Sequence, residues 1–132
     1  MSKFIYLASQ SPRRQELLKQ MGVEFELLLP DANEDAESLE YILASEDALT
    51  YVRRVTLAKL DAAIKRRISR KAKEVPILCA DTTVAIQVGH QDEILGKPKD
   101  DQDANRILQL LSGTAHWVHT AVAIHTQEQT SL

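Results

Sequence analysis

The chain of 132 residues contains a single cysteine, Cys79, which excludes an internal disulfide and a metal site built from cysteines alone. Cys79 lies in an apolar stretch, where a buried thiol is far more common than a nucleophile. No stretch approaches the roughly 18 apolar residues of a membrane-spanning helix, and the N-terminus lacks the apolar run of a signal peptide. We therefore expect a cytoplasmic protein with no membrane contact.

Excess positive charge is also absent, because 16 Lys and Arg residues stand against 19 Asp and Glu residues and the formal net charge is −3. Such a chain has no general attraction for nucleic acid, although a local basic pocket is compatible with it. Two common glycine-rich phosphate loops, GxxxxGK[ST] and GxGxxG, do not occur, which argues against a P-loop ATPase or a Rossmann dehydrogenase. With 44% hydrophobic and 27% charged residues, we predict that residues 1–132 form one globular domain.

Hydrophobic periodicity predicts alternating strands and helices. We expect the basic residues of the long central helix, Arg66 and Arg67 among them, to face water at its solvated side and end. The order predicts an α/β fold with a mixed β-sheet flanked by helices. The expected elements are strand 4–7, helix 12–21, strand 23–29, acidic loop 30–38, helix 47–70, strand 76–80 continued extended over 82–88, turn 89–92 back to 94–95, a helix from about 101 to 112, and strand 117–124.

The run Leu7-Ala-Ser-Gln-Ser-Pro-Arg-Arg14 ends the first strand and opens the first helix. Ser11 is a good N-cap, and Pro12 suits the first helical position. The unpaired N–H groups of this first turn, two serine hydroxyls and the side chains of Arg13 and Arg14 together predict a phosphate site. An ordinary turn with solvated arginines is equally compatible with these residues, although the helix dipole disfavours two cations there.

Three further residues have both a functional and a structural interpretation. Asp81 follows an apolar strand, where a carboxylate binds a metal or deprotonates water, or simply forms a turn. Lys97 lies between Gly96 and Pro98, where it holds an oxyanion or is an ordinary surface lysine. Glu34 belongs to the acidic loop and is either a metal-facing carboxylate or a solvated acid.

Four motifs, in this order and spacing, resemble the Maf family of nucleoside triphosphate pyrophosphatases, once described as septum formation inhibitors. The resemblance covers essentially the whole chain and implies a two-lobed fold related to inosine triphosphate pyrophosphatases. It also implies hydrolysis of a nucleoside triphosphate to the monophosphate and pyrophosphate, with a divalent metal, Mg²⁺ or Mn²⁺. The motifs are Leu7–Arg14, Ala80-Asp-Thr-Thr-Val84, Ile94-Leu-Gly-Lys-Pro98 and Leu111-Ser-Gly-x-x-His-x-Val-x-Thr120.

The resemblance also implies roles for individual residues. Asp81 matches the proton acceptor, and Arg13 and Thr82 match positions linked to substrate choice. The Ser-Pro-Arg-Arg and Ala-Asp-Thr forms resemble the branch that acts on dTTP and UTP, and not the branch that acts on 7-methyl-GTP. Asp81 and Glu34 would hold the metal, and the other residues that match the cleft lining are Ser9, Arg14, Lys59 and Lys97.

The chain departs from the family in length, because members run to roughly 190 residues and carry a later segment that supplies more of the cleft. We therefore expect an N-terminal two-thirds of the family domain, with an unpaired sheet edge that favours a homodimer. An alternative function is a nucleotide-binding regulatory module of low activity, linked to cell division. Asp81 and Lys97 favour the enzyme, since a mere binder does not need them, whereas the shorter length favours the module.

Overall fold

The computed structural model describes residues 4–126 and 129–132. It confirms the predicted alternation of strands and helices, and it adds a 3-10 helix, η1, and a final short strand, β6. The elements are β1 (Phe4–Leu7), α1 (Pro12–Gln20), β2 (Glu24–Leu27), η1 (Glu37–Glu40), α2 (Ala48–Ser69), β3 (Ile77–Val88), β4 (Gln91–Leu95), α3 (Asp101–Leu111), β5 (Trp117–Thr126) and β6 (Gln129–Ser131).

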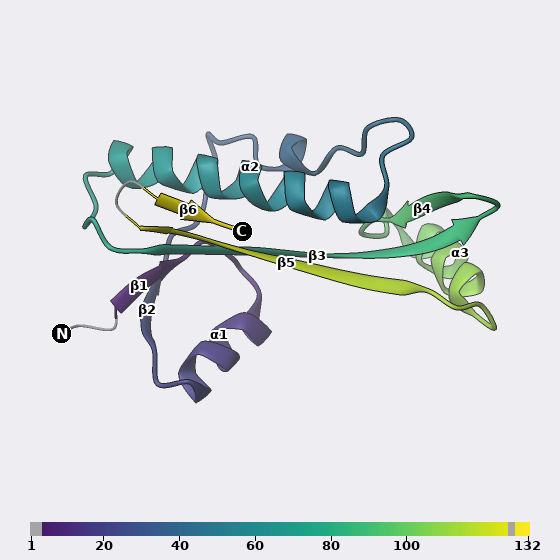
Figure 1. The fold of residues 1–132 in the computed structure, drawn as a ribbon, viewed down its shortest axis with the longest axis horizontal. Helices are drawn as coiled ribbons and strands as arrows, with labels where there is room; N and C mark the ends of the chain where they lie inside the picture. Colours follow the sequence, from purple (N-terminus) through teal and green to yellow (C-terminus); the bar gives the residue numbers. More distant parts are fainter. Residues whose placement is uncertain (1–3, 127–128) are drawn as a thin grey trace.

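The described strands form one sheet of six strands, which is mixed, as the sequence predicts. Its order is β2-β1-β3-β5-β6, and β4 pairs with β3 off this path. Strand β1 is parallel to β2 and β3, whereas β3 pairs antiparallel with β4 and β5. The long strands β3 and β5 run side by side along most of the molecule (Figure 1).

Helix α2 lies along one side of β3 and β5, and α1 lies on the opposite side (Figure 1). The Asp47 side chain caps α2 by accepting a hydrogen bond from the Thr50 N–H at 2.7 Å. Val52, Val55 and Leu60 recur at helical spacing and are almost fully buried, so α2 turns one apolar face toward the sheet.

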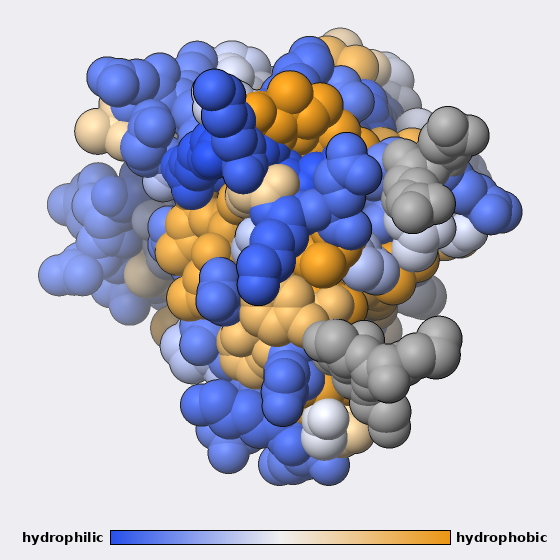
Figure 2. Space-filling view, turned by 90° about the vertical axis from the view of Figure 1, so that its left-hand side faces the viewer, coloured by the Kyte–Doolittle hydropathy of each residue, from blue (hydrophilic) through white to orange (hydrophobic). Residues whose placement is uncertain are grey.

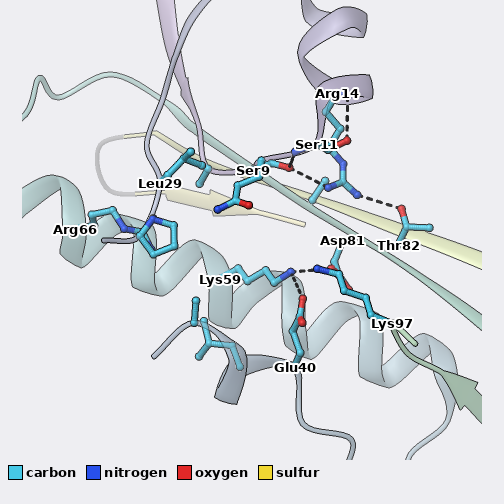
Figure 3. A pocket seen from close by; sticks show the side chains of 16 residues that line it. Ser9, Ser11, Arg14, Leu29, Glu40, Lys59, Arg66, Asp81, Thr82 and Lys97 are labelled. Atoms are coloured by element: carbon cyan, nitrogen blue, oxygen red, sulfur yellow. Dashed lines mark hydrogen bonds and ion pairs between the residues drawn. The ribbon is translucent and has the colours of Figure 1, made fainter. Parts of the chain in front are cut away.

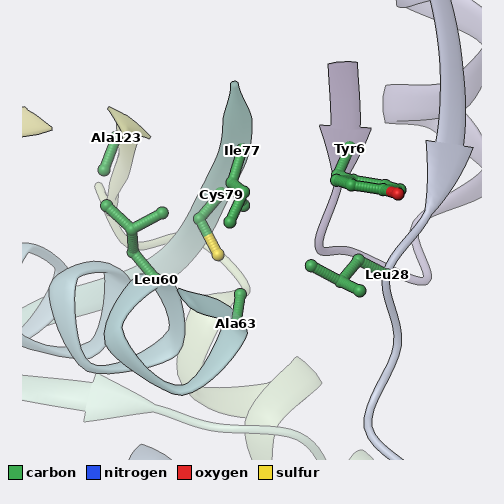
Figure 4. Close-up of a cluster of buried hydrophobic side chains, with 7 residues drawn as sticks. All are labelled: Tyr6, Leu28, Leu60, Ala63, Ile77, Cys79 and Ala123. Atoms are coloured by element: carbon green, nitrogen blue, oxygen red, sulfur yellow. The ribbon is translucent and has the colours of Figure 1, made fainter. Parts of the chain in front are cut away.

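The hydrophobic core lies between α2 and the sheet (Figure 4). Leu60 and Ala63 of α2 meet Ile77 and Cys79 of β3, and Tyr6, Leu28 and Ala123 complete the cluster. Cys79 is buried, as the sequence predicts, and burial raises the pKa of its thiol to about 11, so the thiolate is scarce at neutral pH. At the end of the molecule where β1 begins, apolar surface is exposed between hydrophilic side chains (Figure 2).

The structure corrects the expectation that Arg66 and Arg67 face water, because they are only 8% and 7% exposed. The physical reason is that both guanidinium groups reach backbone carbonyls of the neighbouring layer. Arg66 Nη1 donates to the Leu28 carbonyl at 2.9 Å, and Arg67 Nη1 donates to the Val75 carbonyl at 3.4 Å. Their aliphatic stems remain inside the fold, as amphipathic side chains allow.

Two element boundaries also differ from the predictions. Strand β2 covers only Glu24–Leu27, because the chain then turns into the core at Leu28. The hairpin turn is confined to Gly89 and His90, where Gly89 has a φ of +66°, and β4 already begins at Gln91.

Candidate functional site

The candidate site lies along a stretch of the β3 edge that none of the described strands covers. Strand β1 pairs with β3 only at Ile77 and Leu78, and β4 begins its pairing at Val84. Between these two pairings, the edge of β3 opens onto a cavity of about 620 Å³. The carboxyl end of β1 and the loop after it border the same cavity, which is the place where α/β folds bind ligands.

Asp81 lies inside β3 and not after its end, because residues 77–88 form one continuous strand. This corrects the expectation that the buried strand ends at Ala80: pairing with β5 continues through Asp81. Alternation along β3 turns Asp81 toward α2 and Thr82 toward α1. The open edge lets both side chains line one cavity, although they belong to opposite faces of the sheet.

The loop from β1 to α1 forms one wall of the cavity. The Ser11 hydroxyl caps α1 by accepting from the Arg14 N–H at 3.3 Å, as its sequence position predicts. The Arg14 guanidinium donates to Ser9 Oγ at 3.1 Å and to Thr82 Oγ1 at 3.2 Å (Figure 3). Thr82 Oγ1 also lies 2.9 Å from Thr120 Oγ1, which fixes its hydroxyl. The Arg14 guanidinium therefore joins the loop, through Ser9, to strand β3, through Thr82.

Arg13, the neighbour of Arg14, is exposed and is not among the residues that line the cavity. Successive helical residues point about 100° apart, so the side chains of Arg13 and Arg14 leave α1 in different directions. Lys97 does line it, from the loop after β4. Five of the six predicted substrate-binding residues thus border one cavity: Ser9, Arg14, Lys59, Thr82 and Lys97.

Lys59 of α2 lies between two carboxylates (Figure 3). Its ammonium donates to Asp81 Oδ1 at 2.9 Å and to Glu40 Oε1 at 2.7 Å. Burial acts to lower the pKa of Lys59, but these hydrogen bonds and charges outweigh it and raise the pKa above its ordinary value. Lys59 is therefore a fixed cation at neutral pH, and the Asp81 side chain, only 14% exposed, is held beside it.

Glu34 lies outside this group, in the loop after β2. The Arg66 guanidinium donates to both Glu34 oxygens, at 2.9 Å to Oε1 from Nη2 and 2.9 Å to Oε2 from Nε. Hydrogen bonding from Arg66 lowers the pKa of Glu34, against a smaller opposing effect of burial. In this arrangement Glu34 anchors Arg66, and to reach a metal beside Asp81 it would have to leave that pair.

Sequence reasoning missed Glu40 and Arg66, which both line the cavity. Glu40 lies on a short 3-10 helix in a segment without apolar periodicity, so no local signal indicated it. Arg66 follows Lys59 by seven residues, which places both on one face of α2. That spacing could have identified Arg66 before the structure was known.

Cations from three segments and two acids, Asp81 and Glu40, thus meet at the open edge of a mixed sheet, in a cavity suited to an oligophosphate. These features define an α/β protein with a cleft lined by cations and carboxylates. The Maf-like protein family model matches residues 4–132, and the chain belongs to that family.

Curated relatives agree with this assignment. The chain is 56% identical over 126 residues to a dTTP/UTP pyrophosphatase of Albidiferax ferrireducens, covering 96% of this chain and 61% of the relative. It is 52% identical over 128 residues to the enzyme of that name from Ralstonia nicotianae, covering 97% and 60%. A third, from Burkholderia orbicola, is 56% identical over 120 residues, covering 91% and 55%. The chain therefore spans about 60% of the length of the curated relatives it matches.

Among the residues that the structure describes, no helix combines the length and the apolar character that crossing a bilayer requires.

Proposed function

We propose that this chain is a nucleoside triphosphate pyrophosphatase that converts dTTP or UTP to the monophosphate and pyrophosphate. The observation that carries the proposal is the Lys59–Asp81 pair beside the Arg14–Ser9–Thr82 group in one cavity. The name that the relatives share, dTTP/UTP pyrophosphatase, supports the substrate class.

In the proposed reaction, water attacks the α-phosphorus, the bond to the bridging oxygen breaks, and pyrophosphate leaves. Asp81 accepts the proton of the attacking water. Oδ1 of Asp81 is engaged by Lys59, but Oδ2 makes no hydrogen bond to any described residue and is available for water or a cation. Arg14, Lys59 and Lys97 neutralise the charge that grows on the leaving pyrophosphate.

The residues of the cavity fit a divalent cation, Mg²⁺ or Mn²⁺. Magnesium is commonly held by one or two carboxylates together with the phosphates of its substrate. Asp81 would hold the cation, and when bound it would neutralise phosphate charge and polarise the reacting phosphate. No group of three or more metal-ligating side chains occurs within residues 4–126 and 129–132, so phosphate oxygens would complete the coordination. Participation of Glu34 stays a prediction.

Substrate choice is part of the proposal. Thr82 lines the cavity and is fixed by Arg14 and Thr120, so it presents an oriented hydroxyl to the ligand. Arg13, on the exposed side of α1, would need to turn toward the ligand to contribute. We further propose that two copies associate through the sheet.

Product analysis tests the proposed function. The chain is incubated with dTTP, UTP and 7-methyl-GTP in the presence of Mg²⁺ or Mn²⁺, and Asp81→Asn is the matched control. Monophosphate and pyrophosphate from dTTP or UTP, lost in the control, would support the enzyme. Nucleotide-dependent stabilisation without any product would instead indicate a nucleotide-binding module.

A further inference from the structure

Glu40 provides a second carboxylate at the site, opposite Asp81. Its Oε1 accepts from Lys59 Nζ at 2.7 Å, a shorter distance than the 2.9 Å between Lys59 Nζ and Asp81. Glu40 comes from η1, whereas Asp81 comes from β3, so the two acids approach the ammonium from different layers of the fold (Figure 3). Lys59 therefore has a fixed position between two acceptors.

The carboxylate of Glu40 is not needed to hold η1 in place. The buried Tyr51 hydroxyl donates to the Glu40 backbone carbonyl at 2.8 Å. Farther along the chain, Arg54 donates to the Tyr41 carbonyl and to both Glu46 oxygens. The Glu40 side chain is 35% exposed, so its ion pair with Lys59 contributes little to the stability of the fold by itself. A structural role does not account for this acid.

The negative charge of Glu40 is unexpected in a site that we propose binds phosphates. A carboxylate that faces a cavity for phosphates repels them, so removing it should tighten binding if charge alone mattered. The ammonium of a lysine, however, has three N–H donors. Two of them are engaged by Glu40 and Asp81, and the third has no acceptor among the described residues. Lys59 lines the cavity and is therefore able to offer that third donor to a ligand.

We propose that Glu40 is a positioning residue: together with Asp81 it fixes the Lys59 ammonium so that the third N–H faces the phosphates of the nucleotide. Without Glu40, the ammonium would be drawn onto Asp81 alone. The third N–H of Lys59 would then point less directly at the phosphates, and Lys59 would hold Asp81 more tightly. The identity of the ligand rests on the proposed function, whereas the contact between Glu40 and Lys59 does not.

A double-mutant cycle tests the proposal. The variants are Glu40→Gln, Lys59→Met and the two combined. Asp61→Asn is the control, because it removes an exposed acid of α2 that does not line the cavity. The measurements are the Kd for α,β-methylene-UTP, which cannot be cleaved between its α and β phosphates, and the thermal midpoint of unfolding. Steady-state kinetics with UTP separates KM from kcat.

If Glu40 acts through Lys59, Glu40→Gln weakens binding by about tenfold with the side-chain volume conserved. In the Lys59→Met background the same change leaves the Kd unaltered or lowers it, because only the repulsion of phosphate remains. KM rises in Glu40→Gln, while Asp61→Asn has a wild-type KM. The thermal midpoint of Glu40→Gln stays close to that of the wild type.

Three results would overturn the proposal. Tighter binding by Glu40→Gln in the wild-type background would show that only charge repulsion matters. Equal weakening in both backgrounds would show that Glu40 acts without Lys59, for example on a cation. If the wild type does not bind the nucleotide, Lys59 has no phosphate to contact and the proposal fails. If binding and coupling are present but no pyrophosphate is released, the proposed function fails while the role of Glu40 stands.

Discussion

At the scale of single residues, Arg66 shows how a buried cation is satisfied. Its side chain is 7% exposed, and it donates to both oxygens of Glu34 and to the Leu28 carbonyl. Burial of a guanidinium is tolerated only when such partners are present. Glu34 therefore stabilises the wall of the cavity whether or not it also contacts a metal.

We predict that Glu34→Gln lowers the free energy of unfolding by about 1–2 kcal/mol at neutral pH, because Arg66 loses its counter-charge. The hydrogen bonds from Arg66 lower the pKa of Glu34 in the folded state. The stabilisation is thus complete above the ordinary carboxyl pKa and is lost as the pH falls through the lowered value.

Urea unfolding between pH 3 and roughly pH 7 checks this, since the range spans the ordinary Glu pKa. The wild type should lose more stability on the acid side than Glu34→Gln does. Parallel pH profiles for the two proteins would contradict the assigned role.

Asp81 is the residue on which the proposed chemistry depends. An oriented general base contributes about 10²–10⁴-fold, so we predict that Asp81→Asn lowers kcat by that factor. The amide still accepts a hydrogen bond from Lys59, which preserves the local packing. Initial rates of pyrophosphate release provide the measurement, and a wild-type rate in the variant would remove Asp81 from the mechanism.

At the scale of elements, α2 links the core to the site. One face of this helix supplies Leu60 and Ala63 to the core, and Lys59 and Arg66 to the cavity. Damage to its packing should therefore disturb both stability and binding.

We predict that Leu60→Ala lowers the free energy of unfolding by about 2–5 kcal/mol, because it leaves a cavity between α2 and the sheet. Leu57→Ala is the matched control on the same helix, since Leu57 is 40% exposed whereas Leu60 is 1% exposed. Chemical denaturation of both variants checks the prediction. Equal losses at the two positions would contradict the observed orientation of α2.

At the scale of the whole molecule, one face of β5 carries a row of exposed apolar side chains. Val118, Val122 and Ile124 alternate along the strand and are 58%, 51% and 36% exposed. Apolar rows of this kind favour association with another surface. We propose that two copies meet through this face of the sheet, in place of the unpaired edge expected from the sequence.

We predict that the wild type sediments as a dimer and that Val122→Lys sediments as a monomer, because a charge in the contact opposes its burial. Gln87→Lys, on an exposed position of β3, is the control for added charge. Sedimentation velocity at several concentrations makes the measurement. A monomeric wild type, or a dimeric Val122→Lys variant, would contradict the proposed contact.

Much of the fold could be predicted from local signals. Apolar periodicity located α2 and α3, and the Ser11–Pro12 pair located the start of α1. The burial of Arg66 could not be predicted from composition, because a basic run near a helix end is usually solvated. The strand end expected at Ala80 was wrong, because pairing with β5 carries the strand through Asp81, a residue of low β-propensity.

The amino-acid sequence by itself determined the order of elements, the family motifs and the residue types available for phosphate binding. These depend on local backbone preferences and on spacing along the chain. The tertiary structure alone decided which of those residues meet. Arg14 reaches Thr82 across 68 positions, and Lys59 meets Glu40 and Asp81 from two different layers. Such contacts depend on where β1 stops pairing with β3, and that endpoint follows from the packing of the whole sheet.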